Sequence, residues 1–171
     1  MKKNRMDLRK LIILAAGAIV AIMLFLRWQE GTGSVNAPEK EKTASNSAVI
    51  DDDIVISVKD VTETASFYPA KINGTELEVI AVKASDGTVR TAFNTCQVCY
   101  NSGRGYYKQD GNRLVCQNCG NRFGMDDVEI TRGGCNPVPI TSEYKETGEE
   151  TITISKDFLT EATVIFQNWS K

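Results

Sequence analysis

The middle and end of the chain consist of short apolar or alternating segments separated by turn residues. The segments that this pattern predicts to be strands are IVISV at 54–58, SFYPAKI at 66–72, TELEVIAVK at 75–83, TVRTAFN at 88–94, GYYK at 105–108, RLVC at 113–116 and ETITI at 150–154. Asn73-Gly74 and Ser85-Asp86-Gly87 are strong turn signals between neighbouring segments. The pattern therefore predicts a mostly β domain built from hairpins.

The last segment of the chain has a helical pattern instead. Ser155 is a suitable N-cap residue, and apolar residues then recur at helical spacing, at Phe158, Ala162, Ile165, Phe166 and Trp169. We expect a C-terminal helix whose apolar face packs on the core.

The most apolar run lies near the N-terminus, where LIILAAGAIVAIMLFL at 11–26 contains no charged residue. At about 1.5 Å per residue it spans roughly 24 Å, and Arg27 and Trp28 can extend it to the interface of a bilayer core of about 30 Å. The alternative is a cleaved signal peptide, but Arg27-Trp28-Gln29-Glu30 is a poor cleavage site. We expect an uncleaved transmembrane signal-anchor helix at 11–28.

Charge is distributed unevenly, and this predicts an orientation. The first ten residues carry a net charge of +4, and the whole chain carries −2. A basic flank at 1–10 stays in the cytoplasm by the positive-inside rule, so the main domain is expected outside the cell membrane. Residues 29–50 are polar and predict a flexible linker, which leaves residues 51–171 as an extracytoplasmic domain. The acidic balance gives no basis for binding nucleic acid.

The candidate chemistry of this sequence depends on its five cysteines, since the chain contains no histidine. Cys96 and Cys99 form one C-x-x-C motif, Cys116 and Cys119 form a second, and sixteen residues, 100–115, lie between the two motifs. Two such turns can direct four thiolates at one centre, which suits Zn²⁺, mononuclear iron, copper or an iron–sulfur cluster. On spacing alone, structural zinc is the commonest occupant, and disulfide formation is the other alternative. An odd number of cysteines would leave one unpaired in that case.

Cys135 stands alone between Gly133-Gly134 and Pro137, in a segment that predicts a tight turn. Such a turn can bring its sulfur to the same centre as a fifth, exchangeable ligand or a redox thiol. The alternative is a buried, inert thiol.

Two family resemblances bear on this stretch. Residues 87–140 resemble the cluster-binding region of Rieske proteins, through Cys116-x-x-Cys119-Gly120-x-x-Phe123 and the Gly- and Pro-rich segment that ends at Ile140. Rieske proteins have histidines where Cys99 and Cys119 stand, so a true Rieske centre is excluded. From about Val55 onward, the sequence also resembles the FtrD-like family of membrane iron–sulfur-containing proteins. The segments that carry this second resemblance are FYPAKINGTELEVIAVK, the two C-x-x-C motifs, GYYK, CGNRF and GGCNP.

The FtrD-like resemblance implies a Rieske-like β domain with rubredoxin-knuckle loops, membrane association, an iron–sulfur centre of [2Fe–2S] type or another metal centre, such as mononuclear iron, and a link to iron transport or redox delivery. It also implies membrane transport or redox partner proteins. One observation opposes a cluster: assembled iron–sulfur proteins usually cross membranes folded with a twin-arginine signal, and the N-terminal flank has no adjacent arginines. Zinc, copper or mononuclear iron would avoid that difficulty.

The sequence is compatible with three functions. The first is an iron–sulfur or iron-binding component of a membrane transport or electron-transfer system. The second is a zinc-stabilised structural or interaction module of a membrane complex. The third is a thiol–disulfide protein, although no thioredoxin-like pattern surrounds the motifs. No acid–base or nucleophilic constellation is evident, so we do not expect a self-sufficient enzyme.

Overall fold

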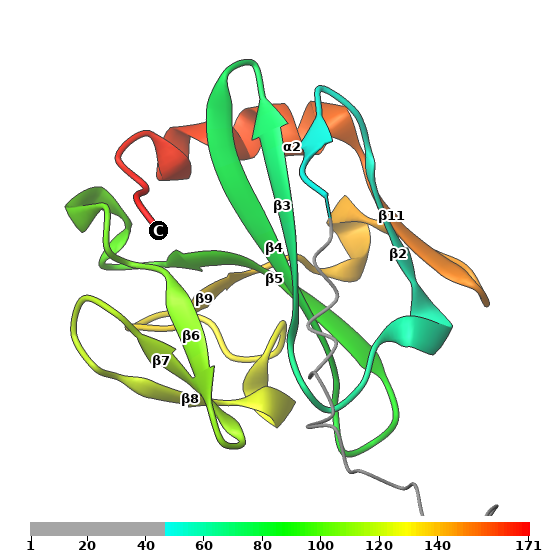
Figure 1. The fold of residues 1–171 in the computed structure, drawn as a ribbon. Coiled ribbons are helices and arrows are strands. Elements are labelled where there is room, and N and C mark those ends of the chain that lie inside the picture. The colour runs from blue at the N-terminus through cyan, green and yellow to red at the C-terminus, as the bar shows by residue number, and fades with distance from the viewer. Residues whose placement is uncertain (1–46) are drawn as a thin grey trace, which may run out of the picture. The chain divides into compact units, whose positions relative to one another are not determined.

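The computed structural model describes residues 47–171 (Figure 1). Its largest sheet has five strands in the order β1-β3-β4-β5-β9. These strands are β1 (Val49–Ile50), β3 (Ser66–Ile72), β4 (Thr75–Lys83), β5 (Val89–Cys96) and β9 (Pro137–Pro139). β1 runs parallel to β3, and the other pairs are antiparallel. Asn73 and Gly74 both have positive φ in the turn between β3 and β4, which is the backbone that a two-residue hairpin requires.

Two three-stranded sheets lie against this one. The first has the order β10-β11-β2, from β10 (Glu146–Thr147), β11 (Thr151–Ile154) and β2 (Ile54–Ser57). The second has the order β6-β7-β8, from β6 (Tyr107–Asp110), β7 (Arg113–Cys116) and β8 (Arg122–Gly124). The helical elements are α2 (Lys156–Ala162) and the short 3-10 turns η1 (Val58–Asp60), η2 (Tyr100–Ser102), η3 (Met125–Asp127), η4 (Ser142–Tyr144) and η5 (Thr163–Phe166).

The central strands of the large sheet are buried on both faces, because each face packs on a different core. In β4, Val79 and Ala81 belong to one core, whereas Ile80 and Val82 belong to the other. The first, which we call the helix-side core, includes β2, β11, α2 and η5 residues such as Ile56, Ile154, Leu159 and Phe166. The second, the cysteine-side core, includes Tyr107, Leu114, Phe123, Cys96 and Cys116. Two candidate ligands are therefore part of a hydrophobic core.

The predicted C-terminal helix is confirmed, with a shorter extent. Ser155 caps it, since its Oγ accepts a hydrogen bond from the Phe158 amide at 3.3 Å. The α-helix ends at Ala162 and continues as the 3-10 turn η5 to Phe166, so Trp169 lies beyond both. Trp169 nevertheless packs on the helix-side core, and its indole donates to the Asn94 carbonyl at 2.9 Å.

Several boundaries differ from those expected. Val49 and Ile50 form β1 on the edge of the large sheet, so the β domain includes two residues that the sequence pattern assigned to the linker at 29–50. The strand expected at 105–108 begins instead at Tyr107. Three strands of two or three residues, β8, β9 and β10, were not predicted.

The expected membrane anchor at 11–28 lies outside the described residues, as does the basic flank at 1–10. Within residues 47–171, none of the helices has the length and apolar character needed to cross a bilayer. The fold class is confirmed as mostly β with one short C-terminal α-helix in this part of the chain.

Candidate metal centre

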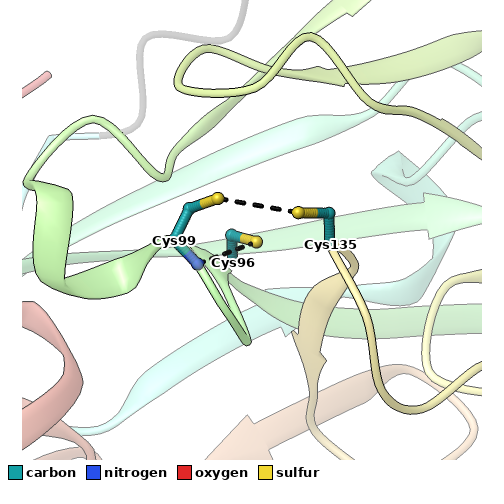
Figure 2. A group of neighbouring side chains, drawn as sticks. All are labelled: Cys96, Cys99 and Cys135. Atoms are coloured by element: carbon teal, nitrogen blue, oxygen red, sulfur yellow. Dashed lines mark hydrogen bonds between the residues drawn. The ribbon is translucent and has the colours of Figure 1, made fainter.

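The first cysteine loop begins where β5 leaves the large sheet. Cys96 is the last residue of β5, and the ladder with β9 is irregular between Phe93 and Cys96. The chain then turns tightly, so that the Cys99 amide donates a hydrogen bond to the Cys96 sulfur at 3.3 Å (Figure 2). An amide directed at the first sulfur of a C-x-x-C turn stabilises a thiolate there, because it places a positive dipole against the developing charge.

The second loop repeats this geometry at the end of β7. Cys116 is the last residue of that strand, and its carbonyl accepts from the Gly120 amide at 2.9 Å, which closes the turn. Gly120 has φ +75°, a conformation that most side chains resist. Backbone amides of Asn118 and Cys119 are directed at the Cys116 sulfur. Each C-x-x-C motif therefore forms a tight turn at the end of a strand, which we call a knuckle.

Cys135 lies on a third segment, which other residues hold in place. Its carbonyl accepts hydrogen bonds from the Tyr107 hydroxyl at 2.9 Å and from the Asn121 side-chain amide at 2.7 Å. Gln97, in the first loop, accepts from the Gly133 amide at 2.9 Å and donates to the Pro137 carbonyl at 3.1 Å. The Cys135 segment is thus attached to both knuckles and to β6.

The sulfur atoms of the three segments converge. Cys135 Sγ lies 3.6 Å from Cys99 Sγ (Figure 2) and 3.3 Å from Cys119 Sγ. Two groups have all their sulfurs within 4.8 Å of one another: Cys96, Cys99 and Cys135, and Cys99, Cys116 and Cys119. The structure therefore brings together all five cysteines that the sequence singled out, and none is in a disulfide.

The five thiols differ sharply in exposure. Cys96 and Cys116, the first residues of their motifs, are 0% and 1% exposed. Cys99 and Cys135 are half-buried, and Cys119 is exposed. We call Cys96 and Cys116 the inner pair, and Cys99, Cys119 and Cys135 the outer trio. A centre held by these residues would have one side in the cysteine-side core and one side open to solvent.

Protonation follows these environments. Burial opposes ionisation of Cys96, but hydrogen bonds from the amides of Cys99 and Val98 outweigh it and lower its pKa. Burial raises the pKa of Cys116 to about 12. The Asn121 amide lowers the pKa of Cys119, and sharing a proton with Cys119 and Cys99 raises the pKa of Cys135. A metal ion at this site would displace the remaining protons, because thiolates are the ligating form.

The donor set fits a thiolate-bound metal or cluster. Five sulfurs converge from three hydrogen-bonded segments, and the chain has no histidine that could replace one of them. All-sulfur coordination is typical of iron–sulfur clusters, mononuclear iron and zinc. Two aromatic residues near the site, Tyr107 and Phe123, lie in the cysteine-side core. Arg122 and Arg132 form exposed ion pairs with Asp110 and Glu143.

The residues that sequence reasoning missed are the ones that position the loops. Asn94 accepts a hydrogen bond from the Tyr107 amide at 2.7 Å, which ties β5 to β6 beside the centre. Gln97 and Asn121 stand inside or directly after the motifs and hold the Cys135 segment. Polar residues of this kind look like ordinary loop residues in a sequence, because their partners lie on other segments.

These features define a β domain that carries a clustered cysteine site, and comparison with known proteins gives its family. The model for the family described as membrane iron-sulfur containing protein FtrD-like matches residues 58–166, which is more than half of the chain. The chain belongs to this FtrD-like family, and the resemblance seen in the sequence is confirmed. No curated protein matches the chain.

Among solved structures, the chain is similar to that of the quaternary ammonium Rieske monooxygenase CntA in complex with inhibitor MMV12. The identity is 14%, the TM-score is 0.40, and the match covers 67% of this chain and 32% of that one. A similarity of this degree has no bearing on the chemistry of the present chain.

Proposed function

We propose that this protein is a membrane-anchored iron–sulfur electron carrier that serves a membrane iron-transport or redox system. The observation that carries the proposal is the convergence of two knuckles and the Cys135 segment on one all-sulfur site with an open side. Membership of a family described as membrane iron–sulfur containing supports iron as the occupant and the membrane as the location.

The residues that would hold a [2Fe–2S]-type centre are Cys96, Cys99, Cys116 and Cys119. When bound, such a cluster supplies one-electron transfer at a potential set by its ligands and their hydrogen bonds. The inner pair would be shielded by Tyr107 and Phe123, whereas Cys99 and Cys119 face outward. Cys119 is therefore the point where a partner protein would approach for an electron to pass.

The Cys96 and Cys116 sulfurs also receive hydrogen bonds from their own loops. These amides offset negative charge on a thiolate-bound centre, and they favour the reduced form over the oxidised one. The nearby Tyr107 hydroxyl remains protonated, because burial raises its pKa well above its ordinary value. This part of the site provides a fixed, uncharged surrounding for a centre that gains and loses one charge.

A zinc-stabilised module is the second candidate, and one measurement favours it. Zn–S bonds of about 2.3 Å in a tetrahedron separate the sulfurs by roughly 3.8 Å. The sulfur of Cys135 lies 3.3 Å from that of Cys119 and 3.6 Å from that of Cys99, which is close to that value, so a single ion bound by these three residues would need only small movements. In this case the domain would be a scaffold for a membrane complex.

The experiment that separates the two candidates is elemental analysis with a visible spectrum, on full-length protein purified in detergent without oxygen. The proposal requires about two irons and two sulfides per chain, with a spectrum that bleaches on reduction. About one zinc and no visible absorption would overturn it, because Zn²⁺ is d¹⁰ and colourless. Cys96→Ser/Cys116→Ser is the matched control, since it removes only the inner pair and should abolish either centre.

A further inference from the structure

The outer trio contains more thiols than a four-ligand centre needs on that side. Cys99, Cys119 and Cys135 come from three different segments, yet Cys135 lies 3.6 Å from one and 3.3 Å from the other. Cys99 and Cys119 are themselves within 4.8 Å. Together with the inner pair, these residues supply five sulfurs for a centre that takes four.

Hydrogen bonds to its backbone hold Cys135 in this position. Tyr107 and Asn121 both donate to its carbonyl, at 2.9 and 2.7 Å. The Asn121 link is informative, because Asn121 follows Cys119 by two residues and the Cys116 amide donates to its carbonyl at 2.9 Å. The second knuckle and the Cys135 segment are thus connected directly, and their cysteines are held side by side.

Cys119 differs from its two neighbours in ways that make it the replaceable ligand. It is the exposed member of the trio, and its sulfur is the one closest to Cys135. Cys99, by contrast, is half-buried and packs against the cysteine-side core. Moving the Cys99 side chain away from a metal would therefore disturb core packing, whereas the Cys119 side chain can move outward into solvent.

We propose that Cys119 and Cys135 are interchangeable ligands at the outer position of the centre. In one state Cys119 is bound as thiolate and Cys135 is a thiol. In the other, Cys135 gives up its proton and binds, while Cys119 leaves and takes a proton. No electron is gained or lost, and the number of thiolates on the metal is unchanged. This inference rests on the proposed function only in requiring a thiolate-bound centre, and it holds for zinc as well as for iron.

The test compares Cys119→Ser, Cys135→Ser, the double variant Cys119→Ser/Cys135→Ser, and Cys116→Ser in the full-length protein. The readouts are metal content and the rate of metal release to a chelator. Each single outer variant should retain the metal content of the wild type. Even loss of a supporting residue weakens metal sites by about 10–100-fold, so the double variant and Cys116→Ser should release metal at least roughly tenfold faster than the single variants.

Two results would overturn the exchange. One is a Cys119→Ser protein that loses metal as fast as Cys116→Ser, and the other is a double variant that retains metal as well as Cys119→Ser. Reconstitution with Co²⁺ checks the ligand count, because the thiolate-to-cobalt absorption should be equal in the wild type and both single variants and lower in the double variant. Wild-type protein that contains zinc instead of iron would contradict the proposed function. The relative rates of metal release from the variants would still test whether Cys119 and Cys135 exchange.

Alkylation of the metal-loaded wild type gives a measurement that does not depend on the folding of a variant. Brief treatment with iodoacetamide should modify one outer thiol per chain, and peptide mapping should find the label divided between Cys119 and Cys135. A label confined to Cys135 would contradict the exchange and leave Cys135 a bystander thiol.

Discussion

The hydroxyl of Tyr107 donates a hydrogen bond to the backbone carbonyl of Cys135 over 2.9 Å. Tyr107 is fully buried on β6, and its own amide donates to Asn94 on β5. This one residue, through its hydroxyl and its backbone amide, therefore connects the Cys135 segment to two sheets. The same hydroxyl also interacts with the Cys96 thiol.

Tyr107→Phe should loosen the Cys135 segment without removing any ligand. The ring still fills the core, and Asn121 still bonds the carbonyl, so we expect the free energy of unfolding to fall by about 1 kcal/mol. Metal release to a chelator should be faster than in the wild type, while metal content is unchanged. Urea unfolding and release kinetics measure the two effects. Tyr106→Phe is the control, because the structure gives the Tyr106 ring contacts with Trp169 and Lys108 away from the cysteine carbonyl. Equal effects from the two substitutions would contradict the role of the Tyr107 hydroxyl.

A cluster held here should have a low, pH-independent potential. Thiolates donate more charge to iron than imidazoles do, which places the potential near the plant-ferredoxin value of about −400 mV and below the Rieske range of roughly −150 to +300 mV. The chain has no histidine to ionise on a ligand, so the midpoint potential should not change between about pH 7 and 9. Redox titration at several pH values measures this. A clear slope would show that a proton is taken up with the electron.

The sequence predicted those parts of the fold that local signals determine. The hairpin at Asn73-Gly74 depends on two residues with positive φ, and the flanking strands were found with the correct ends. β9 was missed because Pro137 and Pro139 have poor strand propensity and are tolerated only at the edge of a sheet, where β9 lies. β10 has only two residues, and its existence depends on pairing with β11.

The candidate site, like the fold, could be predicted only where local sequence signals determine it. The two knuckles follow from motif spacing, which is local. The convergence of Cys135 was only one of two alternatives, since it depends on contacts that Gln97 and Tyr107 make across 36 and 28 residues. The division into an inner pair and an outer trio could not be read from the sequence, because both C-x-x-C motifs look symmetric until the core buries Cys96 and Cys116.

Gly105 is required by the first knuckle for reasons of space. A Cβ at this position would lie 2.7 Å from the Cys99 carbonyl oxygen and 2.8 Å from its carbon, and both are backbone atoms that cannot move without the loop. Gly105→Ala should therefore displace Cys99, with a cost of about 1–3 kcal/mol in unfolding free energy and a loss of metal. Chemical denaturation and metal analysis measure these. Gly111→Ala is the control: its φ of +59° adds strain, but nothing lies near its Cβ and it is not in a cysteine loop. Full metal content in Gly105→Ala would contradict the prediction.

Asp86 contributes to the stability of the folded domain, and this contribution depends on pH in the acidic range. The Thr88 hydroxyl and amide donate to its carboxylate at 2.6 and 2.9 Å, and Arg90 lies beside it, which together lower the pKa of Asp86 to about 2. Because the carboxyl of an unfolded chain titrates near about 3.9, this contribution to stability is present above pH 4 or so and is lost as the pH falls toward 2. Asp86→Asn should remove that part of the pH dependence and leave the profile at higher pH parallel to the wild type. Thr88→Val, which retains the amide donor, should give an intermediate profile. A carboxyl carbon of Asp86 that titrates near pH 4 by NMR would contradict this prediction.

Lys171 and Glu78 form a partly buried ion pair between the C-terminal segment and the large sheet. Glu78 is 6% exposed in its side chain, and both of its oxygens lie 2.7 Å from the Lys171 ammonium, which is 32% exposed. Glu78 also accepts from Asn94, the residue that ties β5 to β6. Lys171→Met should lower the unfolding free energy by about 1–2 kcal/mol, because it leaves a buried carboxylate without its cation while solvent near Lys171 reduces the cost.

The decisive measurement is a double-mutant cycle by urea unfolding, with Glu78→Gln as the second substitution. The double variant should be less destabilised than the sum of the single variants, with a coupling of roughly 1 kcal/mol. Additive effects would mean that the two side chains contribute to stability independently. The matched surface pair Arg122 and Asp110, both more than half exposed, should give a coupling close to zero in the same experiment.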